Sequence, residues 1–316
     1  MTAIALPDRV RAGHWTDRRG WTGCTVILPP EGSVAASEVR GGGPGTRESD
    51  LLSPASTVTG VHALLLAGGS AYGLAAADGV VRWLSERDVG LRTSAGVVPL
   101  VPAAVVYDLA LGAGDARPDQ SAGYTACEAA APELERGSVG AGTGCTVGKL
   151  LGPESWTKGG IGAASARLAG GATIAALAVV NAFGEVLAED GSVLAGVWVD
   201  GSYRRTVELL QEGRNPLRPW RESTTLVCVL TDAVLTKTEA WLVARAASAG
   251  VARSVSPSAT AVDGDVSYCI ATGRVPADTI AVSALAAETT AEAIRDAVRT
   301  AAGAPGCAAA GERGVT

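Results

Sequence analysis

The sequence predicts an α+β fold in which β-sheets pack against each other. Strand-like stretches are frequent early in the 316 residues, and the longest helical pattern comes late. Hydrophobic residues make up 47% of the chain and charged residues 18%, so a sizeable core is expected. With one Phe against 41 Gly, the interior must be built mostly from Ala, Val and Leu, and such small side chains let layers approach closely.

Strands are predicted where short apolar, β-branched runs are bounded by Gly, Pro or polar turn residues. Residues 97–106 contain Pro99 and Pro102, which indicates an edge or bulged strand. A buried strand at residues 224–232 begins abruptly after a polar loop that holds Pro216 and Pro219. The other predicted strands are residues 22–28, 34–39, 61–67, 172–180, 195–199 and 267–271.

Helices are predicted at residues 70–86, 237–249 and 279–302. Ser70 is a suitable N-cap for the first. In the second, Leu242, Ala246 and Ala249 recur at the i, i+4 and i+7 positions of one face, and Gly250 is placed to stop the helix.

Composition argues against several classes of protein. The net charge is −6 and no basic patch is visible, so nucleic acid is not an expected partner. Two His and six Cys without C-x-x-C spacing suit neither a metal centre nor a thioredoxin-type motif, and no cofactor is expected. Residues 1–11 show no secretory signal, and no apolar run is long enough to span a membrane. Reduced thiols and a cytoplasmic location are therefore predicted.

Residues 137–149 form a glycine-rich run that superficially resembles a phosphate loop. The P-loop pattern requires Gly where Thr143 stands and Ser or Thr where Leu150 stands, and the dinucleotide fingerprint fails at Cys145. Nucleotide binding is therefore rejected. What remains is a run that presents Lys149, either as a desolvated ammonium group or as an ordinary surface lysine.

Polar side chains that suit catalysis stand at the end of a predicted strand or just before one. Tyr107 could donate from its phenol into a cleft, and Asn181 could donate its amide N–H to an oxyanion. Asp263 and Asp265 flank a glycine and could orient an ammonium or hydroxyl group. Ordinary turns and half-buried positions use the same residue types, so the alternative at each position is a structural role.

The start of the 224–232 strand suits a self-cleaving protein. Cleavage between Ser223 and Thr224 would leave Thr224 with a free α-amino group beside its own hydroxyl, and that amine could serve as general base. A Thr-Thr pair that merely opens a strand is the alternative. The polar connection at residues 204–223 is the expected place of cleavage, which would divide one catalytic domain, residues 1–316, into chains 1–223 and 224–316.

Short motifs occur in order along most of the chain. They are GGGPGTRE at 41–48, GGSAYGL at 68–74, VPAAVVYD at 101–108, GAGTG at 140–144 with Gly148 and Lys149, NAFG at 181–184, TTL at 224–226 with Thr231 and Asp232, and DGD at 263–265. As an ordered set they resemble the DmpA-type family of self-processing aminopeptidases. That family includes L-aminopeptidase/D-esterase, β-peptidyl aminopeptidases, the nylon-oligomer hydrolase and a pantetheine hydrolase.

The resemblance implies a four-layer αββα sandwich of the N-terminal-nucleophile hydrolase type, autocleavage before Ser or Thr, and homo-oligomers of the two-chain unit. Carried over by motif, the implied site consists of the nucleophile Thr224, the oxyanion donor Asn181, the charge-tuning residues Tyr107 and Lys149, and the orienting carboxylates Asp263 and Asp265.

The sequence thus predicts an amide hydrolase for small amides or short peptides with a free N-terminus, acting through a Thr224 ester. One alternative is an acyltransferase of the ornithine acetyltransferase type, which would pass the acyl group to an amine instead of water. Its own cleavage-site pattern is not matched here. A second alternative is a binding relative that never processes itself.

Overall fold

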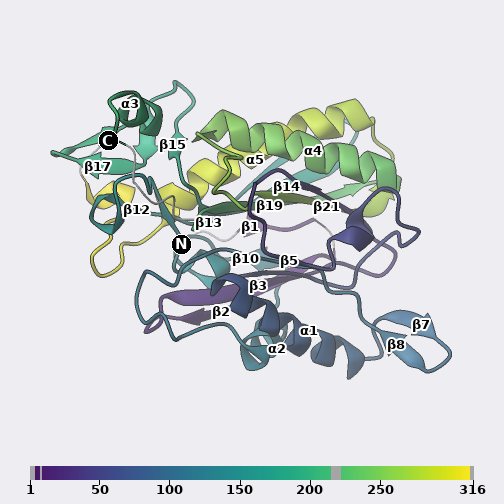
Figure 1. The fold of residues 1–316 in the computed structure, drawn as a ribbon. Coiled ribbons are helices and arrows are strands. Elements are labelled where there is room, and N and C mark those ends of the chain that lie inside the picture. The colour runs from purple at the N-terminus through teal and green to yellow at the C-terminus, as the bar shows by residue number, and fades with distance from the viewer. Residues whose placement is uncertain (1–3, 8, 215–221, 314–316) are drawn as a thin grey trace.

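The computed structural model describes residues 4–7, 9–214 and 222–313, which form four stacked layers (Figure 1). Two five-stranded sheets lie face to face, and a pair of helices covers the outer surface of each. This is the αββα arrangement, so the predicted α+β class is confirmed. The predicted loop with Pro216 and Pro219 lies outside the described residues.

The first sheet has the strand order β13-β14-β19-β21-β4. Neighbours are antiparallel except β19 and β21, which run parallel. The strands are β13 (Gly160–Arg167), β14 (Thr173–Asn181), β19 (Thr224–Ala233), β21 (Val266–Val275) and β4 (Val34–Val39). Helices α4 (Lys237–Ser254) and α5 (Thr279–Thr300) cover its outer face.

The second sheet has the order β2-β3-β6-β9-β5, again with one parallel pair, β6 and β9. Its strands are β2 (Arg11–Asp17), β3 (Thr22–Leu28), β6 (Leu64–Ala67), β9 (Ala103–Val105) and β5 (Thr46–Arg47). Helices α1 (Ala76–Ser85) and α2 (Gln120–Glu128) lie on its outer face (Figure 1).

Shorter elements extend the edges of the sandwich. Small sheets pair β1 (Ile4–Ala5) with β10 (Glu133–Leu134), β11 (Thr146–Val147) with β12 (Thr157–Lys158), β7 (Leu91–Thr93) with β8 (Gly96–Val98), β17 (Val197–Val199) with β18 (Ser202–Arg204), and β15 (Glu185–Leu187) with both β16 (Val193–Ala195) and β20 (Val255–Ser256). The remaining helices are α3 (Thr206–Gln211) and the 3₁₀ turns η1 (Asp50–Leu52), η2 (Ser70–Ala75), η3 (Gly140–Gly142), η4 (Pro153–Ser155) and η5 (Ala310–Glu312).

The central strand β19 is buried on both faces, which explains its nearly continuous apolar sequence. Leu226, Cys228 and Leu230 point into the core between the two sheets. Val227 and Val229 point the other way, into the core beneath α4 and α5. This alternation decides which side chains at the start of the strand face the inside of the sandwich.

Helix α4 differs from the prediction in both its end and its inner face. It continues through Gly250 to Ser254, and a Cβ at Gly250 would lie 2.3 Å from the carbonyl oxygen of Ala287 in α5. The glycine therefore permits close helix packing instead of stopping the helix. The predicted apolar face is wrong as well, since Leu242 and Ala249 are exposed and the buried side is built around Val243 and Ala247.

Two further stretches depart from the predicted elements. Residues 97–106 do not form one edge strand: the prolines lie in the connection between β8 and β9, and β9 is an inner strand of its sheet. The predicted polar connection at 204–223 contains α3, in which Leu209 is buried. The polar residues around Leu209 conceal this buried apolar position in the sequence.

We expect Gly250→Ala to lower the free energy of unfolding by about 1–3 kcal/mol, because the added methyl group must push two packed helices apart. Gly170→Ala is the matched control, since no atom lies within 4 Å of its Cβ position. Urea unfolding of both variants checks the expectation. Equal stability of the two would contradict the tight α4–α5 contact.

Candidate active site

Thr224 and Asn181 lie directly opposite each other on the neighbouring strands β19 and β14. Both side chains belong to the face that points between the sheets, because Leu226 and Val179, two positions away on each strand, lie in that core. Asn181 is completely buried and Thr224 is 6% exposed. The strand pairing therefore brings the predicted nucleophile and the predicted oxyanion donor together.

The carbonyl group of Ser223 is held between two donors. The Thr224 hydroxyl donates to this carbonyl oxygen over 2.6 Å, and the backbone N–H of Gly264 donates to it over 2.8 Å. A Cβ at Gly264 would lie 2.7 Å from the Thr224 Oγ1 atom, so only glycine fits there. Sequence reasoning did not assign Gly264 a role, although its place between two aspartates was a signal.

Lys149 is buried and points at the same place. Its backbone N–H donates to the Phe183 carbonyl, and the preceding N–H of Gly148 donates to Gly184, which anchors the lysine beside the end of β14. The ammonium group donates to Asn181 Oδ1 over 2.8 Å and to the carbonyl oxygen of Glu222. Of the two predicted readings, the desolvated lysine is therefore the right one. Burial lowers the pKa of Lys149 to about 8.

Asn181 connects the parts of this network. Its Oδ1 atom also accepts from the N–H of Thr146, and its amide group donates to the carbonyl oxygens of Tyr107 and Glu222, over 2.9 and 3.1 Å. The Tyr107 phenol faces the Glu222 carboxylate; burial first, and then that carboxylate, raise the pKa of Tyr107. Glu222 is thus a member of the site that the sequence did not indicate.

The two predicted carboxylates hold the backbone around Thr224. Asp265 accepts from the N–H groups of Thr225 and Ala259, over 2.6 and 2.9 Å. Asp263 accepts from the hydroxyl and N–H of Thr260. Burial, followed by repulsion from Asp263, raises the pKa of Asp265 to about 7.

The glycine loop after β4 packs against this acidic turn. The N–H groups of Gly41 and Gly43 donate to the carbonyl oxygens of Asp265 and Asp263. The loop thus approaches the chain's own acidic turn closely and holds the residues on both sides of Gly264.

Comparison with known proteins decides the family. The sequence profile of peptidase family S58 matches residues 8–310. The chain belongs to peptidase family S58. This confirms the resemblance to the DmpA-type aminopeptidases.

Similar sequences cover nearly the whole S58 chain. An uncharacterized aminopeptidase of Mycobacterium tuberculosis is 42% identical over 307 residues, which are 92% of this chain and 87% of that protein. A 6-aminohexanoate-oligomer endohydrolase of Agromyces sp. is 31% identical over 310 residues, 91% of this chain and 83% of that enzyme.

Solved structures share the fold of the S58 chain. The L-aminopeptidase D-Ala-esterase/amidase of Ochrobactrum anthropi, described as a variant of the Ntn hydrolase fold, superposes with a TM-score of 0.71 at 20% identity, over 99% of this chain and 94% of its own. A Burkholderia sp. β-aminopeptidase gives 0.69 at 23% identity, over 95% and 89%. The predicted N-terminal-nucleophile hydrolase fold is therefore confirmed.

Two further buried charges fix the loops of the S58 site. Asp108 accepts from the Thr22 hydroxyl and from the N–H of Gly69, which secures the backbone next to Tyr107; burial raises the pKa of Asp108 to about 6. The fully buried Lys158 donates to three carbonyl oxygens, those of Gly142, Cys145 and Gly159. Lys158 thereby holds the glycine run that leads to Lys149.

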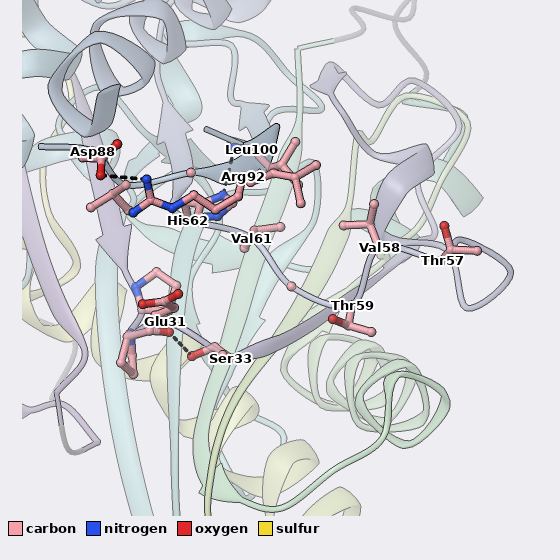
Figure 2. A pocket seen from close by; sticks show the side chains of 17 residues that line it. Glu31, Ser33, Thr57, Val58, Thr59, Val61, His62, Asp88, Arg92 and Leu100 are labelled. Carbon is pink, nitrogen blue, oxygen red and sulfur yellow. Dashed lines mark hydrogen bonds and ion pairs between the residues drawn. The ribbon is translucent and has the colours of Figure 1, made fainter. Parts of the chain in front are cut away.

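A spacious pocket of about 640 Å³ lies away from this network (Figure 2). It borders the β3–β4 turn, at the end of β4 where Val34 pairs with Ala271 of β21. This is roughly 17 Å along β21 from Val266, the end of the strand that lies near Thr224. Several of its polar side chains are engaged with neighbours: His62 accepts from the N–H of Leu100, and Arg92 pairs with Asp88 over 2.7 Å. Pocket size is therefore no guide to the chemistry here.

The part of the chain that the structure describes lacks the features of several other kinds of site. No group of three or more His, Cys, Asp or Glu in that part is arranged to hold a metal ion. All six cysteines are buried free thiols. Among the described helices, none is both long and apolar enough to cross a membrane.

Asp265→Asn tests the buried carboxylate through the pH dependence of stability. Between about pH 4 and pH 7 the folded protein keeps a proton on Asp265 that the unfolded chain has lost, so stability falls as pH rises. The variant lacks this dependence but loses one acceptor oxygen. It should therefore be clearly less stable than wild type at pH 5, with a smaller gap at pH 8.

Urea unfolding at both pH values measures this gap. Asp115→Asn, at an exposed position, is the control and should follow wild type throughout. A gap for Asp265→Asn that is the same at both pH values would show that Asp265 is ionised across the range.

Proposed function

We propose that this S58 peptidase cleaves itself between Ser223 and Thr224 and then hydrolyses amide bonds with Thr224 as N-terminal nucleophile. The observation that carries this proposal is the position of the Thr224 hydroxyl, 2.6 Å from the Ser223 carbonyl oxygen, with the Gly264 N–H on the same oxygen. A hydroxyl and an oxyanion donor thus meet at one peptide bond.

Self-cleavage proceeds as an N→O acyl shift. The Thr224 oxygen attacks the carbonyl carbon of Ser223, the C–N bond breaks, and the nitrogen of Thr224 leaves as an amine that takes up the hydroxyl proton. Water then hydrolyses the ester. The products are a carboxylate on Ser223 and a Thr224 that carries both a free amine and its restored hydroxyl.

Release of the segment before Thr224 also relieves an unfavourable burial. Within the described residues, the Ser223 hydroxyl is buried and has no hydrogen-bond partner. An unpaired buried polar group costs about 1–3 kcal/mol. Cleavage allows this hydroxyl to reach water, so the same bond that the nucleophile attacks is one whose loss relaxes the structure.

In catalysis the new amine acts as general base and the hydroxyl attacks a substrate amide. The acyl group passes to Thr224, the substrate amine leaves with a proton, and water releases the acid. The Lys149 ammonium lies in the same buried network, and a nearby positive charge lowers the pKa of an amine. Lys149 therefore helps to keep the Thr224 amine neutral and able to accept a proton.

Two donors are available for the oxyanion. Gly264 already donates to the carbonyl oxygen of the bond to be cleaved. Asn181 has one N–H on Tyr107, and its other N–H faces the segment before Thr224. We assign Gly264 as the first donor and keep Asn181 as the second.

Family membership supports hydrolysis of peptides or amides, and the named relatives are aminopeptidases and 6-aminohexanoate-oligomer endohydrolases. We therefore propose small amides or short peptides as substrates. A homo-oligomer of two-chain units and a cytoplasmic location remain expectations from the sequence. Light scattering of the purified protein tests the oligomer.

Thr224→Ala should abolish hydrolysis of amino-acid p-nitroanilides, because it removes the attacking oxygen. Thr224→Ser should keep part of the activity. Thr225→Val is the matched control: within the described residues the Thr225 hydroxyl is buried without a partner, and this position faces the helices, so activity should stay near wild type. Assays with and without an added amine acceptor also show whether acyl transfer competes. Retained hydrolysis in Thr224→Ala would refute the nucleophile.

Asn181→Ala should lower kcat by about 10²–10³, the usual cost of one lost oxyanion donor. The assay uses alanine p-nitroanilide, which has no second carbonyl for Asn181 to bind. Because Asn181 is fully buried and makes four hydrogen bonds, a thermal melt must accompany the assay. A folded variant with near-normal turnover would exclude Asn181 from the oxyanion site.

A further inference from the structure

The segment before Thr224 is held at two successive carbonyl groups. The Ser223 carbonyl, which belongs to the bond to be cleaved, accepts from Gly264. The next carbonyl upstream, that of Glu222, accepts from the Lys149 ammonium and, over 3.1 Å, from the Asn181 amide. The buried cation of the site therefore contacts the backbone one residue before the reacting carbonyl.

This contact has a counterpart in catalysis. The ester formed during the acyl shift is chemically an acyl-enzyme whose acyl group is the chain that ends in Glu222 and Ser223. A substrate that acylates Thr224 forms the same ester bond. The groups that hold the Glu222 carbonyl are then the groups that meet whatever is attached to the nitrogen of the substrate's reacting residue.

We propose that Lys149 selects substrates whose reacting residue is N-acylated, so that the enzyme cuts inside amide chains in preference to releasing a free N-terminal residue. This inference rests on the proposed function and replaces the free N-terminus expected from the sequence. An acyl carbonyl in the place of the Glu222 carbonyl accepts a charge-assisted hydrogen bond from Lys149.

A free α-ammonium group fits this place poorly. It would stand beside the Lys149 ammonium in a buried site, where like charges repel strongly. The nearby carboxylates are already engaged with other donors: Asp263 accepts from Thr260, and Asp108 accepts from Thr22 and Gly69. Either carboxylate would have to share its oxygens between these donors and the ammonium group.

The chain segment before Thr224 fills the space beside Lys149. The gap between Tyr107, Lys149 and Trp156 is too small for a water molecule while Glu222 and Ser223 are in place. The Lys149 ammonium lies 5.6 Å from the centre of the Trp156 ring. Once the cleaved segment leaves, the acyl chain of a substrate takes over a position already lined with donors.

Three substrates separate the effect of the upstream carbonyl from the effect of the ammonium charge. They are the p-nitroanilides of N-acetylserine, of serine and of 3-hydroxypropanoic acid. The first has the upstream carbonyl, the second has an ammonium, and the third has neither. We expect kcat/KM for the acetylated compound to exceed that of both others at least tenfold. A factor of this size is what one charge-assisted hydrogen bond contributes. In Lys149→Met the advantage of the acetyl group over the third compound should disappear.

Lys237→Met is the matched control, because Lys237 also donates to two backbone carbonyls but stands at the opposite end of β19. It should keep the wild-type ratios. Equal rates for the first and third compounds in wild type, or faster cleavage of the serine compound, would overturn the inference and leave the proposed function intact. Hydrolysis of none of the three would refute the proposed function itself. If Lys149→Met fails to fold, the wild-type ratios still decide.

Discussion

The buried ammonium group of Lys149 is the constraint on which the arrangement of the site depends. A charge removed from water must be met by several acceptors, and here they are Asn181 Oδ1 and the Glu222 carbonyl. Asn181 can offer its oxygen only if its amide turns toward Tyr107 and the segment before Thr224. One desolvated lysine thus fixes the orientation of the asparagine and the path of the chain into Thr224.

Small residues make this geometry possible. Glycine at 264 lets the acidic turn come within hydrogen-bonding distance of the bond before Thr224, and glycine at 250 lets α4 lie against α5. The inner layers are filled by Ala, Val and Leu, as expected from the scarcity of aromatic residues. The close approach of layers leaves room for few polar atoms, so each buried polar group near the site has a definite position.

Much of the fold was accessible from sequence because apolar runs and turn residues mark the strands of both sheets. The candidate residues were accessible through the ordered motifs, and the β14–β19 pairing brings Thr224 and Asn181 together as those motifs imply. Local sequence patterns gave no correct prediction where contacts with residues distant in the sequence determine the structure. Nothing near Gly250 in the sequence reveals the neighbouring helix, and nothing near Glu222 reveals that its carbonyl meets Lys149. Gly264 acts through its N–H, which no side-chain pattern reports.

The most direct test of the account is the mass of the wild-type protein under denaturing, reducing conditions, combined with N-terminal sequencing. The account predicts two chains, residues 1–223 and 224–316, the second beginning with Thr224, whose masses sum to that of the 31.6 kDa chain plus one water. A single intact chain in a preparation that nevertheless hydrolyses amides would contradict the account, because Thr224 would then have no free amine to act as base.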